Sequence, residues 1–126
     1  MIVARIETLE PHEVFVFGSN ASGAHGGGAA LFAYRRFGAV WGQAEGLQGQ
    51  SYGIDTMSGL EVFEQQAHRF LAFARDHPDL RFLVTEVGCG IAGYTPAQVA
   101  GFFAGAPDNV VLPESFRREL ERPRRG

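Results

Sequence analysis

The segment 18–30, with the sequence GSNASGAHGGGAA, is rich in glycine and contains no Asp, Glu, Lys or Arg. It follows an apolar run, 14–17, and precedes a predicted helix. Main chain that lacks Cβ atoms can approach a ligand closely, and the N–H groups at the start of a helix attract negative charge. The segment therefore predicts a site where backbone amides bind an anion, with a phosphorylated small molecule as the ligand.

A comparable segment, 88–94, has the sequence GCGIAGY and also follows an apolar run. It matches the G-x-G-x-x-G pattern of dinucleotide-binding proteins, which opens directly into a helix. Here the next helix is predicted to begin only at Pro96, and too few residues follow to complete a Rossmann sheet. We call residues 18–28 the first glycine loop and residues 88–94 the last glycine loop. We expect the two loops to hold one ligand from two sides.

Three side chains are candidates for acid–base chemistry at this site: His25, Glu45 and Glu86. His25 lies in the first glycine loop, and imidazole titrates near neutral pH. A carboxylate can position a water molecule or accept hydrogen bonds from ribose hydroxyls. Each residue also has a structural alternative: His25 can be a solvent-facing loop residue, and the glutamates can be rim charges or partners of Arg35 or Arg36.

Cys89, in the last glycine loop, is either a nucleophile activated by His25 or a small buried thiol. Asp55, at the end of a predicted strand, is a further carboxylate candidate. Trp41 and Tyr52 can stack on a base, or they can belong to the core.

The composition excludes several kinds of chemistry. All 11 basic residues are Arg, so a Walker A lysine, a Schiff base and a lysine nucleophile are absent. The formal net charge of −3 argues against a dedicated nucleic-acid surface. The four histidines and the single cysteine show no metal-ligand spacing, so no metal and no cofactor are expected.

No apolar run reaches membrane-spanning length, and a cytoplasmic protein without membrane contact is expected. The oligomeric state is left open.

The chain alternates predicted strands and helices and has the length of one domain, 1–126, with a core over about 14–112 and a terminal helix and tail over 113–126. A middle glycine loop, 40–50, has no regular period, and Ser58 or Thr56 is the expected cap of the longest helix. Such alternation predicts an α/β fold in three layers, α/β/α, with a mostly parallel central sheet. Strands are expected at 2–6, 14–17, 51–55, 81–87 and 109–112, and helices at 29–37, 60–77, from Pro96 after a Thr95 cap, and at 113–120.

The pairing of the two glycine loops resembles the macro domain, a fold that binds ADP-ribose and related NAD metabolites. The runs FGSN, HGGGAA, GLQGQSY and GCGIAGY look like those of a compact bacterial and phage group of macro-like proteins. The resemblance covers about residues 14–112. It implies that Asn20 contacts the distal ribose, that glycines of both loops wrap the diphosphate, and that Tyr94 packs beside the ribose. The predicted ligand-binding residues are Gly18, Ser19, Asn20, His25, Gly26, Gly27, Gly28, Gly88, Cys89, Gly90, Ile91, Ala92, Gly93 and Tyr94.

The function expected from these residues is binding of ADP-ribose or a related nucleoside diphosphate. If the protein is an enzyme, the resemblance implies an ADP-ribosyl hydrolase, but not the subgroup that acts through a lysine. Two alternatives stay open. One is a small hydrolase or transferase that uses Cys89 or His25 on a phosphorylated substrate. The other is an interaction module whose loops contact a protein.

Overall fold

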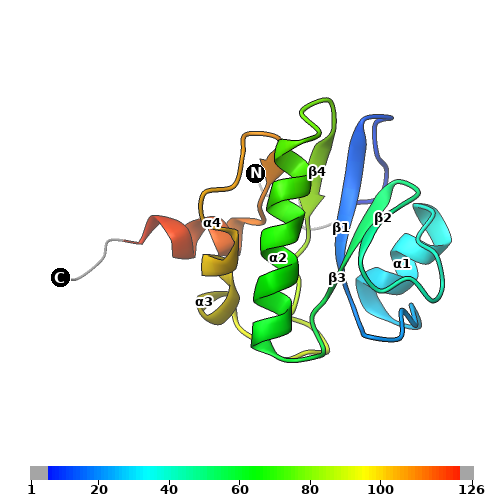
Figure 1. The fold of residues 1–126 in the computed structure, drawn as a ribbon, viewed down its shortest axis with the longest axis horizontal. Coiled ribbons are helices and arrows are strands. Elements are labelled where there is room, and N and C mark those ends of the chain that lie inside the picture. Colours follow the sequence, from blue (N-terminus) through cyan, green and yellow to red (C-terminus); the bar gives the residue numbers. More distant parts are fainter. Residues whose placement is uncertain (1–5, 123–126) are drawn as a thin grey trace.

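The fold, seen in a computed structural model that describes residues 6–122, is built on a five-stranded mixed sheet (Figure 1). The strand order is β2-β3-β1-β4-β5; β2 runs antiparallel to β3, and the other neighbouring strands are parallel. The chain is thus α/β with a mostly parallel sheet, as predicted. The strands are β1 (Glu13–Ser19), β2 (Gly46–Gln48), β3 (Ser51–Asp55), β4 (Arg81–Val84) and β5 (Val110–Val111).

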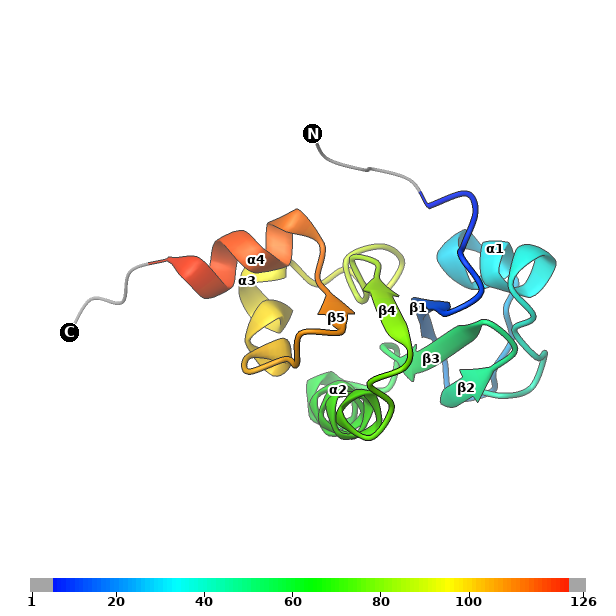
Figure 2. The same ribbon diagram turned by 90° about the horizontal axis from the view of Figure 1, so that it is seen from above.

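Within the described range, four α-helices and one 3₁₀ helix connect or follow these strands. The longest helix, α2, crosses from β3 to β4, while α3, the 3₁₀ helix and α4 gather near β5 (Figure 1). Figure 2 shows α1 and α2 on opposite sides of β1. The helices are α1 (Gly28–Arg36), α2 (Leu60–Arg75), α3 (Pro96–Val99), η1 (Ala100–Phe103, the 3₁₀ helix) and α4 (Glu114–Glu121).

The central strand β1 contributes to two separate hydrophobic clusters because successive side chains of a strand point to opposite faces. Val14 and Val16 belong to the larger cluster, which includes the apolar face of α2. Phe15 and Phe17 belong to the smaller cluster, which includes α1. This explains why the run 14–17 is apolar without alternation: both of its faces are covered.

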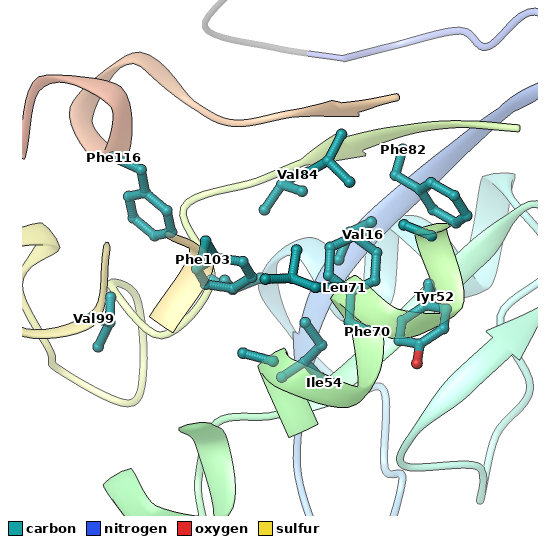
Figure 3. Close-up of a cluster of buried hydrophobic side chains, with 14 of the residues drawn as sticks. Val16, Tyr52, Ile54, Phe70, Leu71, Phe82, Val84, Val99, Phe103 and Phe116 are labelled. Atoms are coloured by element: carbon teal, nitrogen blue, oxygen red, sulfur yellow. The ribbon is translucent and has the colours of Figure 1, made fainter. Parts of the chain in front are cut away.

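The larger cluster is rich in aromatic rings (Figure 3). Phe70 of α2 lies with its ring centroid 5.1 Å from that of Tyr52 and 5.4 Å from that of Phe82. Phe103 of the 3₁₀ helix and Phe116 of α4 extend the cluster beyond β4, with ring centroids 5.6 Å apart. The C-terminal helix is therefore packed on the same core as α2.

Several expectations about the elements differ from the structure. The strand expected at 2–6 falls mainly outside the described residues, and Ile6 itself is not in a strand. The middle glycine loop contains an unexpected short strand, β2. The cap of α2 is Gly59 without a side-chain hydrogen bond, because the Ser58 hydroxyl donates instead to the carboxylate of Asp55.

The start of α3 agrees with the sequence. Thr95 caps the helix, its hydroxyl accepts the Gln98 N–H at 3.3 Å, and the Gln98 side chain accepts the Thr95 N–H at 2.9 Å. Pro96 occupies the first helical position, as expected. This capping box fixes the chain where the last glycine loop ends.

The connections after β1 and β4 leave the sheet toward different clusters. The chain after β1 continues into α1, which packs in the smaller cluster, whereas the chain after β4 continues into α3, whose Val99 lies in the larger one. Because β1 and β4 are parallel neighbours, their diverging connections leave a crevice beyond their carboxyl ends. Ligands of open α/β sheets bind at such a crevice.

Candidate functional site

A pocket of about 420 Å³ lies at the carboxyl ends of β1, β3 and β4. Its volume falls in the range of small-molecule sites, about 300–1,000 Å³. Its walls come from both predicted glycine loops, from the first turn of α1 and from the segment after β3. The lining residues are 18–20, 24, 27–30, 56–57 and 85–92.

The first and last glycine loops face one another across this pocket. A Cβ atom placed on Gly27 would lie 3.8 Å from Cδ1 of Ile91, in ordinary van der Waals contact. Gly27 has φ −159°, an extended conformation that any residue adopts, so its missing side chain leaves space rather than relieving strain. Ile91 is 81% exposed although it is a large apolar residue. The Ile91 side chain thus approaches Gly27, so the two loops come together at the pocket.

The first turn of α1 presents backbone donors to the pocket. The N–H groups of Gly28, Ala29 and Ala30 are among those that an α-helix leaves without an acceptor. Among the residues that the structure describes, no side chain caps this helix, and its first turn contains no acidic residue. The positive end of the helix dipole is thus directed at the pocket wall without a protein anion to neutralise it.

The last glycine loop offers a second set of donors. Three hydrogen bonds shape it: Cys89 N–H to the Glu86 carbonyl at 3.1 Å, Gly93 N–H to the Gly90 carbonyl at 3.0 Å, and Tyr94 N–H to the Gly88 carbonyl at 2.9 Å. Within the described part of the chain, the intervening N–H groups of residues 90–92 have no acceptor. Consecutive free amides of this kind form a concave anion site.

Two glycines of the pocket are required by packing. A Cβ atom on Gly18 would lie 3.1 Å from Oγ1 of Thr56, so β1 and the chain after β3 approach closely there. Gly88 has φ +81°, and a Cβ atom on it would lie 2.5 Å from the ring of Phe63. Both residues line the pocket, and both also hold the loops in place.

Asn20 and Ser19 line the pocket, but their side chains are engaged within the protein. Oδ1 of Asn20 accepts the Ala24 N–H at 2.9 Å, and Nδ2 donates to the Ala24 carbonyl at 3.0 Å. The Ser19 hydroxyl donates to the carbonyl of Ala44. These side chains fix the turn that begins the first glycine loop.

His25 is placed away from the pocket and is fully buried. Its Nε2 lies 3.2 Å from Oε1 of Gln48, which also accepts the Val40 N–H at 2.7 Å. Since Oε1 can only accept, Nε2 is the protonated nitrogen of the ring. Nδ1 is buried and has no hydrogen-bond partner among residues 6–122. The ring packs edge-on against Phe17 and Trp41. The structure therefore does not bring His25 and Cys89 together.

Glu45, another candidate for acid–base chemistry, pairs with Arg69 of α2 and does not line the pocket. Nε and Nη2 of Arg69 donate to its two oxygens at 2.7 and 3.0 Å. This bond raises the pKa of Arg69. The neighbouring phenol of Tyr52 has its pKa raised to about 12, first by burial and then by the charge of Glu45. Tyr52 belongs to the larger hydrophobic cluster.

Glu86 and Cys89 line the pocket from the last glycine loop. Oε2 of Glu86 accepts a hydrogen bond from the Ser115 hydroxyl at the start of α4. Burial raises the pKa of the Cys89 thiol, and the charge of Glu86 raises it further. Because the thiolate is the nucleophilic form, this upward shift of the pKa disfavours nucleophilic chemistry at Cys89.

Gly26, Gly93 and Tyr94, which were predicted to bind the ligand, do not line the pocket. The Tyr94 ring packs instead toward Phe63, with centroids 6.2 Å apart. A Cβ atom on Gly26 would lie 3.8 Å from the ring of Trp41.

The sequence did not indicate Thr56, Met57, Thr85 and Val87 as part of the site, although all four line the pocket. Thr56 and Met57 directly follow the predicted strand 51–55. Thr85 and Val87 fall within the predicted strand 81–87, which in the structure ends at Val84 and so leaves them at the sheet edge. Asp55, by contrast, is buried and structural, since Oδ1 accepts the Met57 N–H at 2.9 Å and so holds the turn after β3.

Within residues 6–122, no group of three or more His, Cys, Asp or Glu side chains could hold a metal ion. No helix in this range is both long enough and apolar enough to cross a membrane. Comparisons with known proteins found no matching family model, no matching curated protein and no matching solved structure.

Proposed function

We propose that this pocket binds ADP-ribose or a related nucleoside diphosphate, and that backbone amides hold the diphosphate. One observation carries the proposal. The free amides at the start of α1 and those of residues 90–92 line the same pocket, and Gly27 faces Ile91 across it. Two sets of donors on one pocket suit two linked phosphate groups better than a single one.

The arrangement of the sheet supports this proposal. The pocket lies where the connections after β1 and β4 diverge, which is where open α/β sheets bind nucleotides. We also propose, from the resemblance of residues 14–112, that the fold is a macro-like three-layer α/β/α arrangement. Helix α1 then forms one outer layer and α2 the other, as their two separate hydrophobic clusters suggest.

We restrict the proposal to binding. Of the three side chains considered for acid–base chemistry, Glu86 alone lines the pocket. His25 is buried against Gln48, and Glu45 is paired with Arg69. The raised pKa of the Cys89 thiol also disfavours nucleophilic turnover at this residue.

The test is calorimetric titration of the protein with ADP-ribose, ADP and NAD, in the wild type and in Gly27→Asp. The substitution adds a carboxylate to the pocket lining without straining the backbone, since the extended conformation of Gly27 suits any residue and its Cβ atom would be in ordinary contact with Ile91. Like-charge repulsion of the diphosphate should weaken binding by about tenfold or more. Gly26→Asp is the matched control, because it adds the same charge one residue away, outside the lining.

Retained affinity in Gly26→Asp together with its loss in Gly27→Asp supports the proposal. Absence of heat change with all three ligands at millimolar concentration contradicts it. Equal binding by both variants also contradicts it, because the ligand would then sit elsewhere.

A further inference from the structure

We infer that His25 couples the pocket to pH: its ring takes up a second proton only when the first glycine loop opens, so protons and the ligand compete for this loop. The inference rests on the proposed function for the ligand and adds the regulation of the same site. His25 lies in the chain between Ala24 and Gly27, which both line the pocket. The buried ring therefore anchors the part of the loop that forms the pocket wall.

The hydrogen bonds of Gln48 determine which nitrogen of the ring carries the proton. The side-chain amide of Gln48 donates to the carbonyls of Gln43 and Gly46, at 3.2 and 3.3 Å. Its Oε1 accepts the Val40 N–H at 2.7 Å, so the amide group cannot be reversed without losing these bonds. Oε1 therefore faces Nε2 of His25, 3.2 Å away, and Nε2 is the donor while the loop is closed.

The closed loop has no place for a second proton on the ring. This proton would go to Nδ1, which is buried and has no hydrogen-bond partner within residues 6–122. The side chain of His25 is 0% exposed and packs against Phe17 and Trp41. An imidazolium there would combine an unpaired charge with an unsatisfied N–H, and both are costly away from water.

The charged groups on the surrounding elements do not compensate such a charge. In the described part of the chain, no ion pair involves His25, and its own loop contains no Asp or Glu. Glu13 of β1 pairs with Arg81. Glu45, which precedes β2, pairs with Arg69. The titratable and charged groups of α1 carry no negative charge at neutral pH; they are Tyr34, Arg35 and Arg36.

The contacts around the ring lie near the surface and can open locally. Trp41, which contacts the ring, is 53% exposed. Close by, the Gly42 N–H donates to the Gly23 carbonyl at 2.8 Å and joins the middle glycine loop to the first one. Release of these contacts brings the ring into water and leaves the strand pairs of the sheet in place.

The direction of the pH effect follows from where the proton binds. In water, an imidazole takes up its second proton at about pH 6.5. Because the open loop binds this proton and the closed loop does not, a fall in pH shifts the loop toward the open form. The ligand has the opposite effect, because only the closed loop completes the pocket wall.

The test is amide hydrogen exchange of Gly42, measured by NMR at about pH 5.5 and 7.5. Its protection factor corrects for the intrinsic effect of pH on exchange and reports how often the two loops part. The wild type is compared with His25→Gln, which removes the titrating ring but keeps an N–H donor for Gln48. His68→Gln makes the same change at an exposed position of α2 and is the matched control.

In the wild type and in His68→Gln, we expect the protection factor of Gly42 to be about tenfold lower at the acidic pH. In His25→Gln it should be the same at both pH values. In all three proteins it should stay below that of Phe82 in β4, whose N–H donates to the Asn109 carbonyl, because the loop opens without unfolding of the sheet. ADP-ribose at about ten times its Kd should raise it about tenfold.

An equal fall of protection in His25→Gln, or no fall in the wild type, overturns the inference. Protection of Gly42 equal to that of Phe82 also overturns it, because the loop would then not open separately. Binding of ADP-ribose without a gain in protection overturns the competition. Failure of ADP-ribose to bind contradicts the proposed function, whereas the fall of protection in the free protein still supports the coupling of His25 to the loop.

If His25→Gln does not fold, nitrogen-15 NMR of the wild-type imidazole rings decides the matter. At about pH 5.5, the exposed rings of His12 and His68 should carry two protons. A His25 ring protonated on Nε2 alone in the same sample supports the inference. A doubly protonated His25 ring in protein that retains the protection of Gly42 overturns it.

Discussion

Cys89 and Glu86 both line the pocket, and the charge of Glu86 contributes to the pKa of the Cys89 thiol. Burial and the nearby carboxylate both disfavour the thiolate, so the pKa of Cys89 is raised in the folded protein. The folded form thus binds a proton that the unfolded form releases at moderately alkaline pH. This difference makes the reactivity of Cys89 a probe of the site.

We predict that alkylation of Cys89 by iodoacetamide is slow at pH 7 and rises with pH to a midpoint above that of the urea-unfolded protein. The unfolded thiol should titrate near its ordinary value of about 8.5. The rate is followed by mass spectrometry across the pH range. Glu86→Gln should move the folded midpoint downward, because one of the two causes of the shift is removed. A folded midpoint at or below the unfolded one contradicts this prediction.

The position of His25 illustrates what the sequence could not show at the scale of one residue. Its place in a glycine loop favoured an exposed side chain or a ligand contact. In the structure, the partner that keeps it buried is Gln48, 23 residues further along the chain. The side chain of Gln48 also bonds Val40, Gln43 and Gly46. Nothing in the residue types alone indicates that one glutamine joins the first and middle glycine loops.

At the scale of elements, the last glycine loop is held by a glycine that no other residue replaces easily. Gly88 combines a φ of +81° with close contact to Phe63 of α2. A Cβ atom there is strained by the backbone and also clashes with a buried ring. Gly90, two residues on, has open space around its missing side chain and no such φ.

We predict that Gly88→Ala lowers the free energy of unfolding by about 2–4 kcal/mol, the sum of backbone strain and overpacking. Gly90→Ala, the matched control, should change it by no more than about 0.5 kcal/mol. Urea denaturation followed by circular dichroism measures both. A similar small loss for the two variants would show that the loop adjusts without cost around Phe63.

The elements that the sequence predicted well are those with a clear apolar pattern or a local cap of their own. The apolar face of α2 and the unbroken apolar run of β1 follow directly from their residues, and so does the Thr95 cap. The strand β2 has three residues and begins with a glycine, so it carries no pattern of its own. It forms because the chain folds back beside β3, which is a tertiary effect.

At the scale of the whole molecule, the site was predictable only in part for a topological reason. The two glycine loops could be paired because both follow strands expected to be parallel. The segment after β3 was not included, although Thr56 and Met57 line the pocket. This segment could be assigned to the site only if β3 were known to lie directly beside β1. No single segment of the sequence indicates the strand order.

The two hydrophobic clusters meet in β1, and this has a consequence for unfolding. Trp41, the single tryptophan, contacts His25 and Tyr34 on the side of α1, so its fluorescence reports that part of the molecule. Far-ultraviolet circular dichroism is dominated by the helices, of which α2 is the longest. The two signals therefore follow different halves of the structure.

We predict that these two signals give coincident urea transitions with the same midpoint. Loss of β1 from either cluster exposes the apolar residues of the other, so the halves cannot unfold separately. A fluorescence transition that precedes the circular dichroism transition would contradict this. It would mean that α1 detaches while the rest of the sheet remains folded.

The edge of the sheet at β2 is short, and its backbone is already partly occupied. The side chain of Gln43 donates to the carbonyl of Leu47 at 3.0 Å and to that of Glu45 at 3.1 Å. A strand from another chain would have to displace this glutamine before it could extend the sheet. At the opposite edge, β5 has two residues. Neither edge of the sheet therefore offers a long, free strand to which a strand of another chain could pair.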